Sequence, residues 1–373
     1  MALSILHLHS SFDLGGKEAR AVRLMNAFGK RARHTIVSGV PGALGARAAI
    51  DPGIRTDFPQ DAPSLTGRPS VARYQAIARY MRRFDLVLSY NWGAMDGVMA
   101  RRLFGRGLPP LIHHEDGFNE DEAVRLKTDR TIFRRIALPA AQALVVPSVK
   151  LETIAFGTWK QPDWRVRRIS NGIDVRRYAG QRDPRAIPGF VRRRGDVIVG
   201  SVAGLRAVKD LPRLVKAVAA LPEFVRLVIV GEGTEREAIL STAAAAGISD
   251  RVHLPGFLDR PWRYVGLFDI FALSSRSEQF PISAVEAMAA GLPVASPDVG
   301  DVFSMVSGEN RELLSETSFE TALRRFALDE SLRKRVGAAN RARAVGEYDE
   351  EEMIARYAAL YGGAVGRSGI LTG

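Results

Sequence analysis

The chain has 373 residues, 46% of them hydrophobic, which is typical of a protein with two globular domains. It contains no cysteine, which excludes disulfide bonds, thiolate zinc sites and a cysteine nucleophile. The formal net charge of +12 favours an anionic partner: a nucleic acid, an anionic membrane surface or an anionic substrate. An arginine-rich proteome would give the same charge.

The first predicted strand covers residues 4–9. Because no basic leader precedes it, we interpret this segment as a strand and not as a signal peptide, and we expect a cytoplasmic protein. Gly15 and Gly16 then form a turn before a helix from about Ala19 to Phe28. A Gly-Gly turn lets the backbone approach a ligand closely, although many α/β turns need a glycine for structural reasons alone.

Strands and helices continue to alternate through the first half. We predict strands over 35–38, 85–90, 111–114, 143–148 and 169–174, a helix over 71–83 and an irregular segment over 41–70. Trp92, at the end of one strand, has the residue type that stacks on sugars, but it would equally serve as packing.

A polar cluster, His113 to Asp116, follows another strand. Histidine and carboxylate are zinc ligands, so a zinc site is one reading. Adjacent strand residues point to opposite faces, however, so we expect one of the two histidines to be buried.

Residues 124–138 predict a basic amphipathic helix. Such a helix can lie on an anionic bilayer, or it can be a surface helix with its apolar stripe on the core. The arginines of the whole first half favour attraction to an anionic membrane. A linker over 178–194 is rich in Pro, Gly and Arg.

The second half begins a new alternation. It has predicted strands at 196–202, 227–231, 252–257 and 269–273 and a helix at 211–220. Lys209 precedes that helix, where a cation can hold a phosphate.

The most informative stretch is Ser274 to Gly300. After the strand at 269–273, a polar loop leads into a helix from Ser283, which Gly291 and Pro293 end before a second strand. Ligands bind beyond the carboxyl ends of such strands, and a helix N-terminus attracts anions.

Two glutamates with seven residues between them flank that helix N-terminus. Glu286 can hold two ribose hydroxyls and Glu278 a hydroxyl of a second sugar, with a diphosphate between them on backbone amides. Alternatively, one is a solvated loop residue and the other faces a basic neighbour.

The segment SEQFPISAVEAMAAGLPV resembles the signature of the retaining glycosyltransferases of family four. The match includes both glutamates, an aromatic loop residue and E-A-M-A-x-G-x-P-V. The resemblance implies an α/β GT-B fold, in which two doubly wound Rossmann-like domains face each other across a cleft. It gives an acceptor-binding domain at 1–180, a donor-binding domain at 195–349 and a helix at 350–373 that crosses back to the first domain.

The resemblance also implies roles for single residues. Glu286 would hold the ribose, Glu278 the transferred sugar, and Lys209 the diphosphate. The further donor-binding candidates are Gly16, Arg206, Gly231, Phe280, Pro281 and Ile282. The family's arginine on the diphosphate corresponds to Gly204 here, so Arg206 is a candidate substitute.

A second departure concerns the reacting centre. Family members often carry a histidine before a glycine, but here Asp116 precedes Gly117. Both His114 and Asp116 are therefore candidate catalytic residues.

These features predict a retaining glycosyltransferase that moves a hexose-type sugar from a UDP- or GDP-sugar to a lipid-linked or saccharide acceptor at an anionic membrane surface. No D-x-D triplet occurs, so we expect no metal and no cofactor besides the nucleotide-sugar co-substrate. The alternatives are a sugar-nucleotide epimerase of the same fold, an inactive scaffold, or a basic protein that binds a membrane or a nucleic acid. The basic residues lack an aromatic platform, which argues against nucleic acid.

Overall fold

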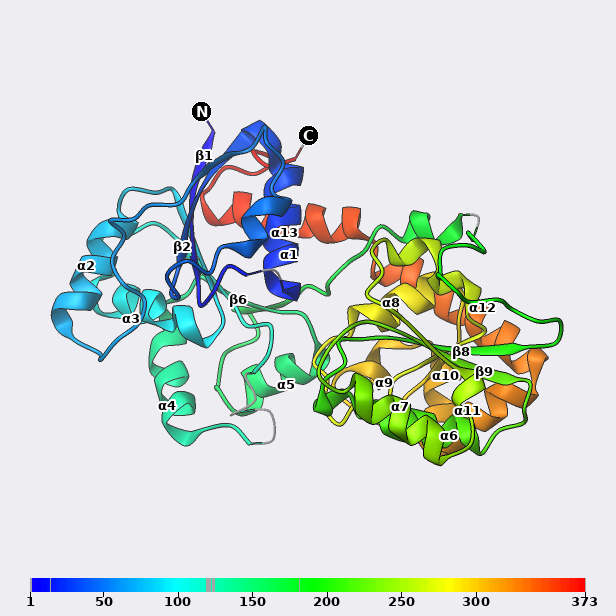
Figure 1. The fold of residues 1–373 in the computed structure, drawn as a ribbon. Coiled ribbons are helices and arrows are strands. Elements are labelled where there is room, and N and C mark those ends of the chain that lie inside the picture. Colours follow the sequence, from blue (N-terminus) through cyan, green and yellow to red (C-terminus); the bar gives the residue numbers. More distant parts are fainter. Residues whose placement is uncertain (1, 14, 119–121, 123–124, 181, 373) are drawn as a thin grey trace. The chain divides into compact units, whose positions relative to one another are not determined.

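The computed structural model describes residues 2–13, 15–118, 122, 125–180 and 182–372. They form two compact units (Figure 1). Unit 1 contains the residues up to Asn171 together with those from Glu351 onward, and unit 2 runs from Gly172 to Glu350.

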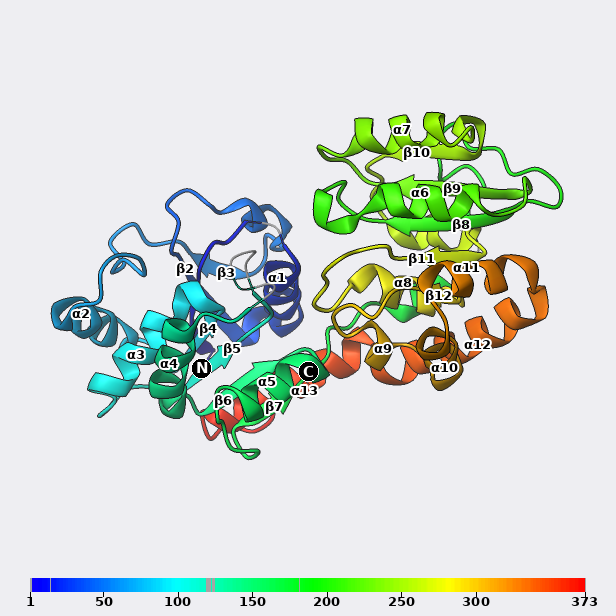
Figure 2. The same ribbon diagram turned by 90° about the horizontal axis from the view of Figure 1, so that it is seen from below.

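Unit 1 is built on a parallel sheet of seven strands in the order β3-β2-β1-β4-β5-β6-β7. Its elements are β1 (Leu3–His9), α1 (Gly16–Phe28), β2 (Ala32–Ser38), β3 (Arg55–Asp57), α2 (Val71–Met81), β4 (Leu86–Tyr90), α3 (Met95–Phe104), β5 (Leu111–His114), α4 (Thr128–Ala137), β6 (Ala143–Val146), α5 (Val149–Gly157), β7 (Val166–Arg168) and α13 (Glu350–Ala364). Figure 2 shows β6, β7 and α5 together at one edge of this unit.

Helices cover both faces of the unit 1 sheet. One apolar core lies beneath α2, α3 and α5, and the other lies beneath α1 and α13. The chain therefore returns to unit 1 at its end, where Tyr357 and Tyr361 are buried. Parallel strands covered on both faces read as continuous apolar runs, as β1 and β4 do.

Unit 2 has a parallel sheet of five strands in the order β10-β9-β8-β11-β12 around one core. Its elements are β8 (Val197–Val202), α6 (Leu211–Ala219), β9 (Val225–Val230), α7 (Arg236–Ala245), β10 (Val252–Gly256), β11 (Ile270–Ala272), α8 (Ile282–Ala289), β12 (Val294–Ala295), α9 (Val302–Met305), α10 (Gly308–Glu316), α11 (Phe319–Leu328) and α12 (Glu330–Glu347).

Both sheets are doubly wound, so each has a point where the strand order reverses. In unit 1 that point lies between β1 and β4, and in unit 2 it lies between β8 and β11. Loops that leave the carboxyl ends of these strands border the crevice where ligands bind in such folds.

The structure corrects several predicted boundaries. The predicted strand at 169–174 is wrong, because the edge strand is β7, Val166–Arg168. The segment predicted as irregular contains β3. The predicted helix at 124–138 is α4, which begins at Thr128, and position 124 lies outside the described residues.

The predicted domain boundary at 180 and the linker at 178–194 also differ from the structure. Ile173, Val175 and Ile187 are buried in the core of unit 2. The backbone of Ile173 bonds to both Tyr348 and Glu350. This Pro- and Arg-rich segment therefore packs on unit 2 through its apolar side chains.

Candidate functional site

The carboxyl ends of β8 and β11 bring Lys209 and Glu278 together in unit 2. Lys209 Nζ donates to Glu278 Oε1 at 2.6 Å, and Ser275 Oγ donates to the same oxygen at 2.6 Å. Ser274 Oγ donates to the backbone carbonyl of Lys209 at 2.9 Å. Two serines shortly after β11 therefore hold this pair, Ser274 through the backbone of Lys209 and Ser275 through the carboxylate of Glu278.

The loop from Glu278 leads directly into α8. Pro281 is buried and precedes the first helical residue, Ile282, with no side chain capping the helix. The first N–H groups of α8 thus remain available to an anion. Phe280 is half-buried, with its ring centroid 5.8 Å from that of Tyr348.

Glu286 lies within α8 and accepts a hydrogen bond from the Tyr178 hydroxyl at 2.9 Å. Tyr178 belongs to a short 3-10 helix, Val175–Ala179, in the segment that the sequence predicted as linker. This contact carries no signal in the sequence, because 108 residues separate the partners.

The glycine-rich turn after β9 packs directly against the loop after β8. Gly231 has φ +145°, and a Cβ there would lie 1.9 Å from the carbonyl oxygen of Ala203. No other residue fits this close approach, so Gly231 has a structural role at the edge of the candidate site.

Arg206 is exposed, and within residues 182–372 its guanidinium forms no hydrogen bond or ion pair. Its Nε would lie 3.6 Å from a Cβ at Gly204, the position where the family resemblance places an arginine. The two positions are therefore close in space.

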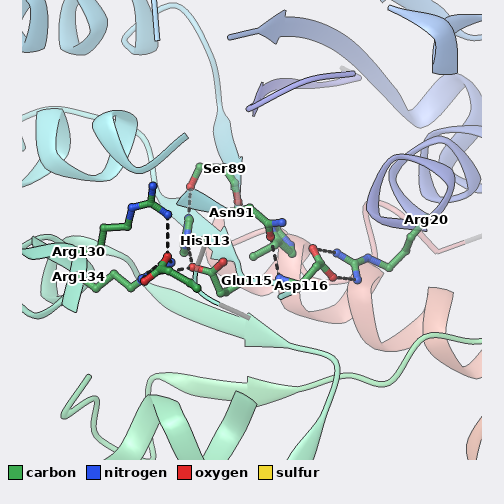
Figure 3. A network of polar contacts seen from close by, with 10 residues as sticks. Arg20, Ser89, Asn91, His113, Glu115, Asp116, Arg130 and Arg134 are labelled. Carbon is green, nitrogen blue, oxygen red and sulfur yellow. Dashed lines mark hydrogen bonds and ion pairs between the residues drawn. The ribbon is translucent and has the colours of Figure 1, made fainter. Parts of the chain in front are cut away.

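In unit 1, Asp116 lies beyond β5 in an ion pair with Arg20 of α1 (Figure 3). Arg20 Nη2 donates to Asp116 Oδ2 at 2.8 Å, and Nη1 donates to Oδ1 and to Asn171 Oδ1. Burial opposes the charge of Arg20, but Asp116 and neighbouring tyrosines outweigh it and raise the pKa of the guanidinium. The pair therefore fixes the position of the Asp116 side chain relative to α1.

Asn91 orients the same loop from the end of β4. Its side-chain oxygen accepts the backbone N–H of Asp116 at 2.7 Å. Its backbone has φ +56° and ψ −175°, a region that is essentially restricted to glycine. Backbone strain of this kind concentrates at functional sites, and Asn91 stands beside the reversal point of the unit 1 sheet.

His114, the other catalytic candidate, is fully buried. Its Nδ1 contacts the carbonyl oxygen of Ser89 at 3.2 Å, and its Nε2 contacts the Tyr361 hydroxyl at 2.8 Å. Burial, followed by the charge of Arg20, holds the pKa of His114 well below its usual value. His114 thus anchors α13 and is not accessible to a substrate in this structure.

The prediction that only one of the two histidines is buried is wrong, because both faces of the sheet are covered. His113 contacts Ser89 Oγ at 2.9 Å, and its Nε2 lies 3.7 Å from Glu115 Oε2. Within the described ranges, no three His, Asp or Glu side chains converge as metal ligands would.

A buried charge network continues from Glu115 to α4 (Figure 3). Arg134 is 1% exposed and pairs with Glu115 and Glu122 at 3.2 Å. Trp92 is one of the aromatic rings over its guanidinium, at 5.0 Å. In this structure Trp92 therefore packs against Arg134, as the packing alternative predicted.

Gly16 is the first residue of α1, with open space around its Cβ direction. Lys17 and the buried Glu18 form an ion pair beside it. The first turn of α1 thus carries charged groups at the carboxyl end of β1, the strand that borders the reversal point.

The family model for group 1 glycosyl transferases matches residues 185–343, which span the Lys209–Glu278 site. The chain is similar to this family over that segment, which is less than half of its length. The putative glycosyltransferase EpsF of Bacillus subtilis is 30% identical over 223 residues, or 54% of each chain. The lipopolysaccharide core biosynthesis glycosyltransferase LpsE of Rhizobium meliloti is 31% identical over 156 residues, which are 41% of this chain and 46% of LpsE.

The match thus spans about half the length of these relatives. Among solved structures, Anabaena HepE in complex with UDP aligns with a TM-score of 0.72 and 20% identity, over 95% of this chain and 98% of HepE. The chain therefore has the GT-B fold with two Rossmann-like units, which confirms the fold expected from the sequence.

Proposed function

We propose that this protein is a glycosyl transferase that moves a hexose-type sugar from a nucleotide sugar, UDP- or GDP-linked, to a lipid-linked or saccharide acceptor with retention of configuration. The observation that carries the proposal is the Lys209–Glu278 pair at the reversal point of the unit 2 sheet, next to the uncapped N-terminus of α8. Cation and carboxylate together suit a ligand that is anionic at one end and rich in hydroxyls at the other.

Each residue then has a distinct task. Lys209 and the N–H groups at the start of α8 stabilise the charge that develops on the leaving diphosphate, which is the main electrostatic requirement of the transfer. Glu286, oriented by Tyr178, accepts hydrogen bonds from the ribose hydroxyls. Glu278 accepts one from the transferred sugar. Arg206 gives a second cation to the diphosphate once the nucleotide is bound.

We place the acceptor beside Asp116 in unit 1. Asp116 is oriented by its pair with Arg20, and its carboxylate oxygens are the acceptor type that would bind an acceptor hydroxyl. The relatives' names include a lipopolysaccharide core glycosyltransferase, which supports a surface glycan or glycolipid as the acceptor class.

A basic chain suits an enzyme that works at the cytoplasmic face of an anionic membrane. On α4, Ile132 and Ile136 are 51% and 50% exposed beside the exposed Arg135, a combination that favours peripheral binding. No helix in the described part of the chain is long and apolar enough to span a bilayer.

The test is a thermal-shift screen of UDP-, GDP-, ADP- and TDP-sugars with the wild type and the variants Lys209→Ala and Glu286→Ala. A ligand at a hundred times its Kd stabilises by about 2.7 kcal/mol, which gives a measurable rise in Tm. We expect one nucleotide family to stabilise the wild type and neither variant.

The matched controls are Lys216→Ala and Glu237→Ala, which remove exposed charges elsewhere in unit 2 and should keep the full response. If no nucleotide sugar stabilises the wild type, or if the control variants lose the response as well, the proposed donor site is wrong.

A further inference from the structure

The edge of the unit 1 sheet carries two arginines that face each other. Arg33 of β2 and Arg55 of β3 are directly paired in the parallel register, so their Cα atoms are about 4.8 Å apart and their side chains share a face. Like charges directly opposite on adjacent strands repel each other and destabilise the sheet. Both side chains are exposed, and within the described residues neither forms an ion pair or a hydrogen bond.

A third arginine approaches the same face from the end of α2. Thr35, two residues after Arg33, pairs with Leu6, which belongs to the apolar core beneath α2 and α3. Arg33 and Arg55 therefore project toward the side of the sheet where α2 ends. Arg83 follows α2, and its guanidinium lies 4.8 Å from the ring centroid of Tyr80.

These side chains line one cavity of about 620 Å³. Asp57 is the one acidic residue among the described residues that line it, against three arginines, so the lining carries a surplus of positive charge. The hydroxyls of Tyr80 and Thr35 add neutral donors. A planar guanidinium fork matches the oxygen atoms of a phosphate group, and stacking on Tyr80 holds one such fork in place.

The cavity is separate from the proposed acceptor region. Arg33 and Arg55 stand at the amino ends of β2 and β3, whereas Asn91 and Asp116 stand beyond the carboxyl ends of β4 and β5. The nucleotide candidates belong to unit 2. A ligand at the arginine edge would therefore not compete with either substrate for the same residues.

We propose that Arg33, Arg55 and Arg83 form a second anion site, which binds a phosphate group at the amino edge of the unit 1 sheet. A bound phosphate removes the repulsion between Arg33 and Arg55 and gives both guanidinium groups a partner. The phosphate belongs either to a soluble phosphate compound or to the headgroup of an anionic phospholipid.

The first measurement is calorimetric titration of the whole chain with inorganic phosphate at low salt. The test variant is Arg33→Gln/Arg55→Gln, and the matched control is Arg79→Gln/Arg82→Gln, which removes two exposed arginines of the same region that do not line the cavity. We expect the test variant to bind phosphate at least about tenfold more weakly, because charge-assisted hydrogen bonds are lost. The control should bind as the wild type does.

Lys209→Ala separates this inference from the proposed function, since it removes the cation of the donor site and leaves the arginine edge intact. It should lose the nucleotide response and keep phosphate binding. Sedimentation with phosphatidylglycerol or phosphatidylcholine vesicles then identifies the source of the phosphate. If only the test variant loses binding to phosphatidylglycerol vesicles, the phosphate belongs to a lipid headgroup. If the test variant loses phosphate binding but still binds these vesicles, the phosphate belongs to a soluble compound.

The inference is overturned if neither phosphate nor phosphatidylglycerol vesicles distinguish the test variant from the control. It is supported further if, without ligand, the test variant unfolds at a higher temperature than the control, as relief of the repulsion predicts.

Discussion

Lys209 and Glu278 are each other's ion-pair partner, with Nζ 2.6 Å from Oε1 and both side chains largely buried. The lysine proposed to hold a diphosphate is thus already neutralised before any nucleotide arrives. On the proposed mechanism, a diphosphate must displace Glu278 from the Lys209 ammonium group. The displaced carboxylate is then available to bind the sugar. Under the proposed function, the pair would therefore couple phosphate binding to the release of the carboxylate that binds the sugar.

Replacement of Glu278 by Gln should strengthen binding of the bare nucleoside diphosphate while it reduces transfer. The amide keeps an acceptor for Ser275 but leaves the Lys209 charge available, so we expect UDP or GDP to bind up to about tenfold more tightly, equivalent to 1.4 kcal/mol. Calorimetry measures the binding, and release of nucleotide from the sugar donor measures the turnover. Glu286→Gln is the control and should weaken binding; weaker binding in Glu278→Gln would contradict the competition.

Tyr178→Phe should weaken nucleotide binding through Glu286 alone. It removes the hydroxyl that orients the carboxylate and keeps the ring, so the expected loss is about 0.5–1.5 kcal/mol of binding free energy. The loss should appear with UDP and be absent with pyrophosphate, which has no ribose. An equal loss with both ligands would mean that the substitution disturbs the unit 2 core instead.

At Asn91, glycine should be tolerated better than alanine. Both substitutions remove the hydrogen bond to the Asp116 backbone, but glycine adopts φ +56° with ψ −175° freely and alanine does not. We expect Asn91→Gly to be more stable than Asn91→Ala by about 1–3 kcal/mol in urea unfolding. The opposite order would contradict backbone strain at this position, because both substitutions lose the same hydrogen bond.

Acid should destabilise unit 1 selectively. Burial is the largest cause that lowers the pKa of His7, His9, His34 and His114, in the case of His34 to about 4. The unfolded chain, with histidine pKa values near 6.5, binds more protons below that pH than the folded chain does, so stability falls as pH decreases from about 6.5 toward 4.

Each of these histidines contributes a slope of at most about 1.4 kcal/mol per pH unit. Urea unfolding between pH 7.5 and pH 5, followed by the fluorescence of tryptophans placed singly in each unit, measures the effect. His7→Asn should flatten the profile of unit 1. An equal acid response in unit 2, which contains one histidine of the six, His253, would argue against this origin.

Arg134→Met should destabilise unit 1 by about 3–5 kcal/mol, because Glu115 would lose the guanidinium that it contacts and Glu122 would lose one of two arginine partners among the described residues. Thermal or urea unfolding measures the loss. Arg135→Ala, at the exposed neighbour, should cost less than about 1 kcal/mol. Replacing Glu115 by Gln as well as Arg134 by Met should recover part of the loss, and no recovery would assign the effect to packing against the aromatic rings.

The strand, loop, helix and strand around Glu278 were predictable because every signal there is local. A buried apolar run, a polar loop and a Gly-x-Pro stop define β11, α8 and β12 within a few residues. The two edge strands of unit 1 were missed for the opposite reason. β3 and β7 read Arg-Thr-Asp and Val-Arg-Arg, and charged, short edge strands carry no apolar pattern.

Contacts between segments that are far apart in the chain could not be predicted from the sequence. Tyr178 contacts Glu286 because the 3-10 helix Val175–Ala179 packs against α8. Arg20 contacts Asp116 because β1 and β5 end at the same edge of a sheet. The sequence left open whether His114 or Asp116 faces the reacting centre, because the burial of His114 depends on α13, whose Tyr361 lies 247 residues later.

The return of α13 to unit 1 also sets an order of events during synthesis. Tyr357, Tyr361 and Met353 complete the core that β1 and α1 begin, and Tyr361 is the partner of His114. During translation, unit 1 cannot complete its core until all of unit 2 has been synthesised, because α13 comes last. Until then, one face of the unit 1 sheet is incompletely covered. We expect chaperones to bind the nascent protein at that stage, at the apolar face that α13 later covers.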